Sequence, residues 1–319
     1  MTAPRRVVAA LGGNAFVPPG GKLTMAGQFR FAREAVGELE PLLGSEVQLL
    51  VAHGNGPQVG HMLVRVERSL GQAYEVPLEV CVAESEGELG YVLQQTIHNA
   101  FAERGSPRAV VSLITQVVVA RDDPAFDDPT KPIGPFYERE RAEELRAAGF
   151  AVREERGRGF RRVVPSPEPR EVVEAEVIAR LLELGIVVVA AGGGGVPVVR
   201  AEGGRLEGVD AVVDKDLSAA LVADGIGADT LLILTGVPYA YIGWGTPEQE
   251  PVRSATPERV RELAGEGHFP PGSMGPKMEA AARFVERTPG RKSIVCDPAS
   301  LRAALAGTAG TQVRSEERT

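Results

Sequence analysis

Hydrophobic and polar residues fall in blocks along this chain rather than alternating one by one. Short runs rich in β-branched residues are apolar on both faces, which is typical of central strands in a parallel sheet. The segments between them, such as Met25 to Leu43 and Pro57 to Leu70, carry apolar residues at helical spacing. The predicted strands are Arg6 to Leu11, Val47 to Ala52, Ala109 to Ala120, Ile186 to Ala190, Thr230 to Leu234 and Ser293 to Cys296. This order predicts an α/β fold with an open, mainly parallel central sheet and helices on both faces.

One long stretch departs from this order. Residues 121–169 are rich in prolines and charges, with a short helical patch around Glu138 to Ala148 and two extended pieces flanking Gly157-Arg158-Gly159. An ordinary surface excursion is the alternative, but nearly fifty residues is long for a plain loop. We therefore predict one α/β domain over residues 1–319, with a small protruding lid subdomain inserted at 121–169.

Composition excludes several classes of protein. Of the 319 residues 43% are hydrophobic and 24% are charged, which is typical of a globular protein with a sizeable core. The formal net charge of -8 disfavours nucleic acid or an anionic membrane as a partner. Two cysteines, Cys81 and Cys296, and four scattered histidines give neither a disulfide framework nor a metal-ligand spacing, so we expect no protein-built metal site.

Neither a signal peptide nor a membrane helix is expected. Gly12-Gly13-Asn14 interrupts the first apolar run too early for a signal sequence. The longest apolar stretch, Leu184 to Val199, contains four consecutive glycines and a proline. The sequence therefore predicts a cytoplasmic protein.

Three predicted strands end in glycine clusters. These are Leu11-Gly12-Gly13-Asn14, His53-Gly54-Asn55-Gly56 and Ala191-Gly192-Gly193-Gly194-Gly195. Ligands bind at the carboxyl ends of the strands in open α/β sheets, and glycine lets backbone amides approach a phosphate closely. A turn after a strand explains any one cluster, but three at one edge favour a polyphosphate site. Neither the dinucleotide-binding fingerprint nor a Walker loop fits these segments, so the site is of another type.

Lysine is rare enough here to be informative. Of 35 basic residues only Lys22, Lys131, Lys215, Lys277 and Lys292 are lysines. Lys215 stands between two aspartates at a predicted helix start, where it can present an ammonium to a phosphate; a capping aspartate with solvated charges is the alternative. Lys277 follows Pro276, predicted at the first helical position, and a cation there opposes the helix dipole unless an anion joins the site.

Together these segments resemble the amino acid kinase superfamily and, within it, the carbamate kinases. The similarity runs from about Val7 to Val313. Besides the three glycine clusters, it rests on Pro129-Thr130-Lys131-Pro132-Ile133-Gly134-Pro135-Phe136, Gly157 to Pro167, Asp214-Lys215-Asp216 and Gly272-Ser273-Met274-Gly275-Pro276-Lys277. The resemblance implies a three-layer amino acid kinase-like sandwich in which the inserted segment is a lid.

The resemblance also implies a reaction and a set of site residues. The reaction is reversible phosphoryl transfer between ATP and carbamate, giving ADP and carbamoyl phosphate, with Mg²⁺ and a homodimer. Lys215 and Lys277 would contact the ATP phosphates, Asp216 would hold both lysines, and Lys131 would reach in from the lid. The predicted phosphate- and acid-binding residues are Gly12, Gly13, Asn14, Gly54, Asn55, Gly193 and Gly194; the predicted nucleotide-binding residues are Thr235, Gly236, Val237, Tyr239 and Met274.

The chain departs from the family pattern at Glu84-Ser85-Glu86, where Met-Thr-Gln is usual, and at Gly243-Trp244. If Glu86 faces the site it would repel an anionic acid; we favour the alternative, a solvated helix start with acids favourable to its dipole. Two other functions therefore stay open. One is a kinase of the same fold acting on another small carboxylate or phosphate acceptor, and the other is a non-catalytic nucleotide sensor.

Overall fold

The computed structural model describes residues 6–12, 24–69, 71–155 and 157–315. Its largest sheet has eight strands in the order β15-β17-β16-β12-β1-β2-β9-β3. Neighbours from β16 through β3 pair in parallel, whereas β17 runs antiparallel to β16. The strands are β1 (Arg6–Leu11), β2 (Gln48–His53), β3 (Val110–Ser112), β9 (Val187–Val189), β12 (Thr230–Leu234), β15 (Ser254–Ala255), β16 (Lys292–Cys296) and β17 (Thr311–Arg314). The predicted mainly parallel sheet is confirmed.

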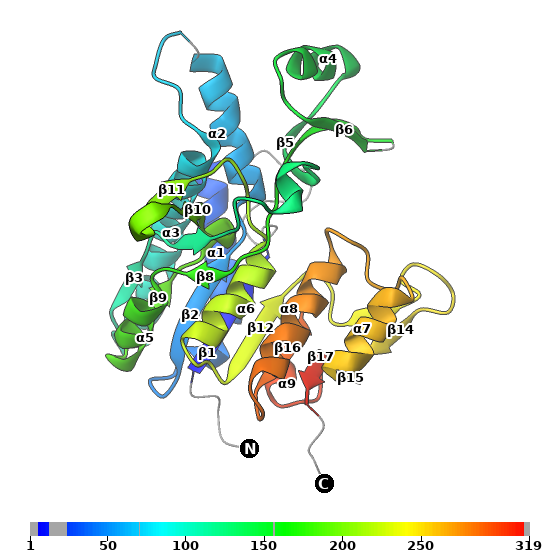
Figure 1. The fold of residues 1–319 in the computed structure, drawn as a ribbon. Coiled ribbons are helices and arrows are strands. Elements are labelled where there is room, and N and C mark those ends of the chain that lie inside the picture. Colours follow the sequence, from blue (N-terminus) through cyan, green and yellow to red (C-terminus); the bar gives the residue numbers. More distant parts are fainter. Residues whose placement is uncertain (1–5, 13–23, 70, 156, 316–319) are drawn as a thin grey trace.

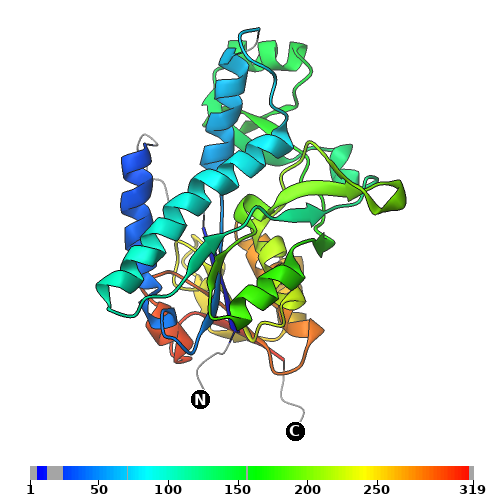
Figure 2. The ribbon, with the colours of Figure 1, turned by 90° about the vertical axis from the view of Figure 1, so that its left-hand side faces the viewer.

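Helices cover both faces of this sheet (Figures 1 and 2). One face, with Val8 and Ala10 of β1, packs against α5 (Ala175–Glu183), α6 (Lys215–Gly225), α7 (Pro257–Gly265) and α8 (Met274–Arg287). The other face, with Val7 and Ala9, packs against α1 (Met25–Glu38), α3 (Leu78–Glu103) and α9 (Leu301–Leu305). Two separate apolar clusters therefore explain why the central strands are apolar on both faces.

Two sequence predictions need correction. The run from Ala109 to Ala120 forms two strands rather than one, because the chain turns after Ser112 and enters a second sheet at β4 (Gln116–Val118). The helix from Met25 ends at Glu38, and the short 3₁₀ turn η2 (Glu40–Leu42) follows around Pro41, which cannot donate a helical hydrogen bond. The prediction for Pro57 to Leu70 is close to α2 (Gly56–Ser69).

The remaining strands build three smaller sheets. A four-stranded sheet has the order β11-β10-β4-β8, with β8 (Glu171–Val172), β10 (Val196–Arg200) and β11 (Leu206–Gly208). β13 (Ala240–Ile242) and β14 (Glu250–Val252) form a hairpin. Short 3₁₀ turns η3 (Pro124–Phe126), η4 (Gly192–Gly194) and η5 (Glu202–Gly204) lie in the connections. None of the helices in the described part combines the length and apolar character needed to cross a bilayer.

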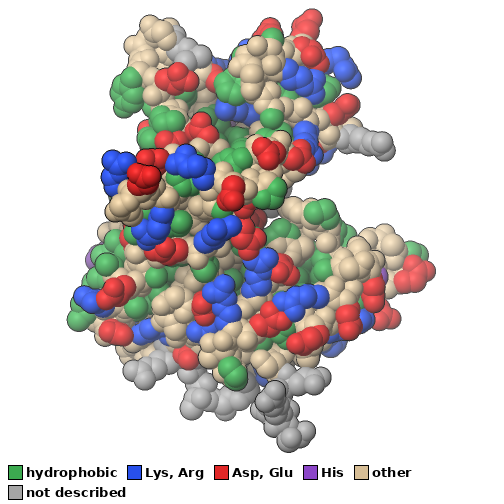
Figure 3. Space-filling model, in the orientation of Figure 1, with side chains coloured by type: hydrophobic (Ala, Val, Ile, Leu, Met, Phe, Trp, Pro, Cys, Tyr) green, Lys and Arg blue, Asp and Glu red, His purple; other side chains and the backbone are tan. Residues whose placement is uncertain are grey.

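The third small sheet projects from the body beside α2 (Figure 1). It has the order β5-β7-β6 and carries α4 (Arg139–Ala147); its strands are β5 (Lys131–Tyr137), β6 (Val152–Glu155) and β7 (Gly159–Val164). Its outer part has a small apolar cluster of its own, whereas Ile133 and Val164 at its base pack into a cluster shared with α2 and α3. Figure 3 shows a notch between this projecting part and the part of the body that carries α7 and α8.

Candidate active site

The glycine clusters follow adjacent strands of the main sheet. β1, β2 and β9 are parallel neighbours, so Gly12, Gly54 and Gly192 lie at their common carboxyl edge. The Gly54 amide donates to the carbonyl of Leu11 at 3.1 Å, which joins the first two turns directly. Gly13 and Asn14, predicted phosphate-binding residues, lie outside the described residues.

Close packing explains the four-glycine run. A Cβ atom at any of these positions would overlap a neighbouring group, and each neighbour belongs to a different part of the edge. The neighbours are His53 and Glu86 for Gly192, Asn55 for Gly193, the Val213 carbonyl for Gly194 and Val117 for Gly195. The run is therefore the point where the segment after β9 meets the segment after β2 and the segment before α6.

The same run forms a tight turn. The Gly194 amide donates to the Ala191 carbonyl at 3.2 Å, and the Gly194 carbonyl accepts from Ser218 Oγ at 2.8 Å. Both backbone groups of Gly194 thus have partners inside the protein, while Gly193 lies against the Asn55 amide. Phosphate binding by Gly193 and Gly194 stays a prediction.

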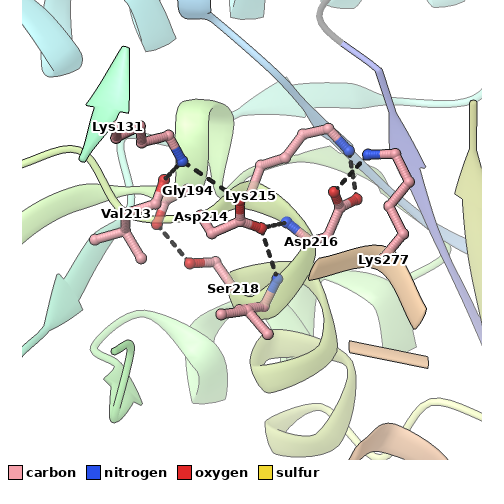
Figure 4. Close-up of polar contacts among 9 residues, drawn as sticks. Lys131, Gly194, Val213, Asp214, Lys215, Asp216, Ser218 and Lys277 are labelled. Atoms are coloured by element: carbon pink, nitrogen blue, oxygen red, sulfur yellow. Dashed lines mark hydrogen bonds and ion pairs between the residues drawn. The ribbon is translucent and has the colours of Figure 1, made fainter. Parts of the chain in front are cut away.

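Asp216 holds two lysines from different helices (Figure 4). Lys215 Nζ is 2.5 Å from one carboxylate oxygen of Asp216, and Lys277 Nζ is 2.8 Å from the other. Lys215 and Asp216 open α6, whereas Lys277 lies in the first turn of α8. Only 3% of the Asp216 side chain is exposed, so the carboxylate lies between the two ammonium groups and away from solvent.

Electrostatics explain why Asp216 stays ionised. Burial alone would raise the pKa of Asp216, but the charges of Lys215 and Lys277 outweigh it and lower the pKa to about 2. For Lys215, burial lowers the pKa, the Asp216 carboxylate opposes that change, and the neighbouring Lys277 charge adds to it. The two positive charges share one negative charge, so the group can accept a further anion.

Two expectations about the helix starts change with this geometry. α8 begins at Met274, which puts Pro276 at its third position rather than its first. Lys277 remains in the first turn, and Asp216 supplies within the protein the anion expected to offset it. At α6 the alternative was a capping aspartate with solvated charges. Its cap is confirmed, because Asp214 Oδ1 accepts from the amides of Asp216 and Leu217, but the charges of Lys215 and Asp216 are largely buried rather than solvated.

Lys131 reaches this cluster from the projecting sheet. It is the first residue of β5, and its Nζ donates to the Val213 carbonyl at 3.1 Å and lies 3.4 Å from Asp214 Oδ2. The structure thus brings Lys131, Lys215, Lys277 and Asp216 together beside the glycine run, as Figure 4 shows.

Comparison with known proteins identifies the family. The sequence profile of the amino acid kinase family matches residues 5–297, which is more than half of the chain. The chain belongs to the amino acid kinase family. Its fold is the amino acid kinase fold, and its activity is that of a kinase.

Curated relatives narrow the comparison within the family. The carbamate kinase of Pyrococcus horikoshii is 44% identical over 313 residues, covering 97% of this chain and 99% of that protein. The carbamate kinase-like protein YahI of Escherichia coli is 42% identical, covering 96% of this chain and 98% of its own.

Solved structures agree with the sequence relatives. Carbamate kinase from Giardia lamblia bound to AMP-PNP superposes with a TM-score of 0.91 at 38% identity, covering 99% of this chain and 100% of that one. N-acetylglutamate synthase from Neisseria gonorrhoeae, at 14% identity, a TM-score of 0.55 and 98% and 60% coverage, shares the fold alone.

The prediction made for Glu86 needs the clearest correction at this site. The prediction of a solvated helix start is wrong, because α3 begins at Leu78 and Glu86 is buried with 1% exposure. Its Oε2 accepts from the Thr115 amide at 2.8 Å. Burial raises the pKa of Glu86 well above its usual value, and hydrogen bonds from the amides of Thr115 and Gly192 only partly oppose this. The acid therefore lies against the glycine run as a group that favours its neutral form.

The predicted nucleotide-binding residues follow β12 or open α8. Thr235 and Gly236 come directly after β12, and the Thr235 amide donates to the Cys296 carbonyl at 2.9 Å. The ring of Tyr239 lies edge-on to Tyr241 at 6.3 Å. Val237 lies between Gly236 and Tyr239 in the sequence, and Met274 is the first residue of α8. Thr235 and Gly236 therefore lie at the carboxyl end of β12, while contact of any of the five residues with a nucleotide stays a prediction.

Two residues at the site, Ser85 and His53, lay outside the predicted set of site residues. Asn55 Nδ2 donates to Ser85 Oγ at 2.7 Å, and Ser85 in turn donates to the Val82 carbonyl at 2.6 Å, so α3 fixes the Asn55 amide. His53 is buried against Gly192, and burial lowers its pKa to about 4, so it is neutral at physiological pH. The His53-Gly54-Asn55 motif marked the segment, but nothing in the sequence connected it with Ser85.

Proposed function

We propose that this kinase is a carbamate kinase, which transfers a phosphoryl group reversibly between ATP and carbamate, giving ADP and carbamoyl phosphate. The observation that carries the proposal is the buried Asp216 carboxylate holding Lys215 and Lys277 at the glycine-lined edge of the sheet. Full-length similarity to carbamate kinases at up to 44% identity supports the choice of acceptor.

In this proposal the site works by positioning and charge. Phosphoryl transfer passes through a loose transition state with charge spread over the phosphoryl oxygens, so it needs no covalent nucleophile from the protein. Lys215 and Lys277 would neutralise the ATP phosphates, and Asp216 would keep both ammonium groups fixed before the substrates bind. The backbone at Gly12, Gly54 and Asn55 would contact the transferring group and the acid.

We propose that the projecting part within residues 121–169 acts as the lid. It would bring Lys131 to the transferring phosphoryl group across the notch seen in Figure 3. The Lys131 ammonium already lies within 3.1 Å of the Val213 carbonyl, directly before α6, which supports a place beside the phosphates.

Mg²⁺ would enter with the nucleotide. Asp214 and Asp216 are already paired with lysines, and the buried Glu86 favours its neutral form. We therefore expect phosphate oxygens of ATP, rather than these carboxylates, to bind the ion. When bound, the ion would neutralise charge on the phosphates. A homodimer is proposed from the family resemblance.

An ATP-forming assay tests the function. The purified chain with carbamoyl phosphate, ADP and Mg²⁺ should form ATP, measured through a coupled NADPH signal, and should prefer carbamoyl phosphate over acetyl phosphate by at least about tenfold in kcat/KM. A preference for acetyl phosphate or a bulkier acyl phosphate would contradict the carbamate assignment. ADP binding without turnover of any acyl phosphate would favour a nucleotide sensor.

A further inference from the structure

Asp214 uses its two carboxylate oxygens for different partners. Oδ1 accepts from the Asp216 amide at 2.9 Å and from the Leu217 amide at 3.4 Å, which caps α6. Oδ2 lies 3.4 Å from Lys131 Nζ. Figure 4 shows this carboxylate between the start of α6 and the lysine of the projecting sheet. One side chain therefore connects the helix that carries Lys215 with the lid.

The other contact of Lys131 lies on the same segment. Its Nζ donates to the carbonyl of Val213, the residue before Asp214. That carbonyl also packs against Gly194, where a Cβ would lie 2.5 Å from it. The ammonium of Lys131 is thus held where the glycine run, the α6 start and the lid meet.

We propose that Asp214 is a positioning residue, which places the lid lysine Lys131 beside Lys215 and Lys277 before the phosphates bind. The proposal rests on the proposed kinase site. It adds to that site the group that fixes the position of the lid relative to α6. Because the pair is partly exposed, at 26% for Lys131 and 25% for Asp214, its attraction is weakened by solvent. The ammonium can therefore exchange from Asp214 to incoming phosphate oxygens without breaking a buried ion pair.

The charges near the pair favour this exchange. Asp216 is saturated by two lysines, so it cannot compete for a third. Asp214 shares its charge with the positive end of the α6 dipole, which weakens its hold on Lys131 further. Polyphosphate oxygens carry more charge than this shared carboxylate and would attract the ammonium more strongly.

The Asp214→Asn variant separates the two uses of the side chain. Asparagine caps helices as well as aspartate does, so α6 should stay capped and the thermal midpoint should change by less than about 2 °C. The charge facing Lys131 is lost. We expect kcat/KM for carbamoyl phosphate to fall roughly five- to twentyfold, with the KM for ADP changed less than about twofold. Should the asparagine variant lose stability, Asp214→Ser offers a second uncharged cap.

A double-mutant cycle decides whether Asp214 acts through Lys131. Lys131→Met should lower kcat/KM at least as much as Asp214→Asn, and the double variant should lose no more than Lys131→Met alone. Losses that multiply would overturn the proposal, as would unchanged or increased turnover in Asp214→Asn.

A second measurement does not depend on turnover. In the ligand-free protein, acetic anhydride labelling followed by mass spectrometry should modify Lys131 faster in Asp214→Asn than in the unaltered protein, by about threefold or more. Lys292, at the opposite, amino end of β16, is the internal reference and should react equally in both. Equal Lys131 labelling would refute the positioning role. If the unaltered protein forms no ATP while labelling differs, the proposed function fails and the Asp214 contact stands.

Discussion

The body and the projecting part, proposed above as the lid, each place lysines at the candidate site, but they hold them differently. In the body, Lys215 and Lys277 lie 2.5 and 2.8 Å from Asp216, whose side chain is 3% exposed. In the lid, Lys131 lies 3.4 Å from Asp214, whose side chain is 25% exposed. The two aspartates are two residues apart in the sequence. Burial, rather than residue type, therefore distinguishes the closely held Lys215 and Lys277 from the partly exposed Lys131.

The apolar packing of the two regions differs in the same way. The body has two extended apolar clusters, one on each face of the main sheet. The lid has only Ala142, Leu145, Val152 and Phe160 as the buried residues of its own cluster, and its base packs into the cluster shared with α2 and α3. A cluster of this size is small for independent stability. The lid therefore depends on the body for its position.

The largest effect is expected where the fixed pair is broken. Asp216→Asn would leave two neighbouring buried ammonium groups without a counter-charge, so we expect loss of turnover by at least about 10³-fold and a loss of about 3 kcal/mol or more in unfolding free energy. Steady-state kinetics measure the loss of turnover, and urea unfolding measures the loss of unfolding free energy. Asp122→Asn, an exposed position in the described chain, is the matched control and should change stability by less than about 0.5 kcal/mol. A stable Asp216→Asn protein would show that the pair is not held by charge.

Removing one lysine should affect activity more than stability. In Lys215→Ala or Lys277→Ala, Asp216 keeps the other lysine as its partner, so the thermal midpoint should stay nearly unchanged. Turnover should fall by about 10²- to 10⁴-fold, because phosphate charge is no longer neutralised. Steady-state kinetics and thermal unfolding check this, with Lys292→Ala as the control. Equal losses of midpoint and activity would point to a structural role.

The lid lysine should have a smaller effect. Lys131→Ala is expected to lower turnover by roughly tenfold to a hundredfold, while the affinity for ADP changes less than about twofold, because in our proposal the lid contacts the transferring group rather than the nucleotide. The coupled assay measures turnover, and titration calorimetry measures the affinity for ADP. Unimpaired turnover would remove Lys131 from the site.

The smallest expected effect concerns Glu86, a buried acid, and the pH dependence of stability. The pKa of Glu86 is raised above its usual 4.5, so the unfolded chain loses this proton at lower pH than the folded protein does. At low pH both states carry the protonated acid and this pKa difference has no effect on stability, whereas the stability of the protein falls as pH rises from 4.5 toward the folded pKa. Glu86→Gln removes that dependence.

Thermal unfolding across pH checks the Glu86 prediction. The glutamine variant should be more stable than the unaltered protein above about pH 5, with a difference that grows with pH and vanishes near pH 4. Its amide oxygen can still accept from the Thr115 amide, so packing should be kept. A variant that is less stable at pH 8 would mean that the folded protein needs the ionised acid.

Much of the fold could be predicted from local pattern. The strands are apolar on both faces because the body has a cluster on each face, so their place in a parallel sheet followed from the sequence. The ends of β1, β2 and β9 could be assigned to one edge because parallel strands share it. The lysines of the site were found because each lies in a distinctive motif.

The failures share a physical cause, which is dependence on distant contacts. The break after Ser112 and the burial of Glu86 both reflect packing between α3 and the glycine run, far apart in the sequence. Likewise the role of Asp214 toward Lys131 joins residues 83 positions apart. Local propensity carries no information about such pairs.

The projecting sheet packs closely against α2 at Gly60, where glycine has no side chain. A Cβ at Gly60 would come 2.6 Å from the backbone nitrogen of Gly134 in β5. A methyl group at position 60 would therefore overlap the Gly134 backbone, so β5 and the projecting sheet would have to shift away from α2. The angle of the projecting sheet, and with it the position of Lys131, therefore depends on whether residue 60 carries a Cβ atom.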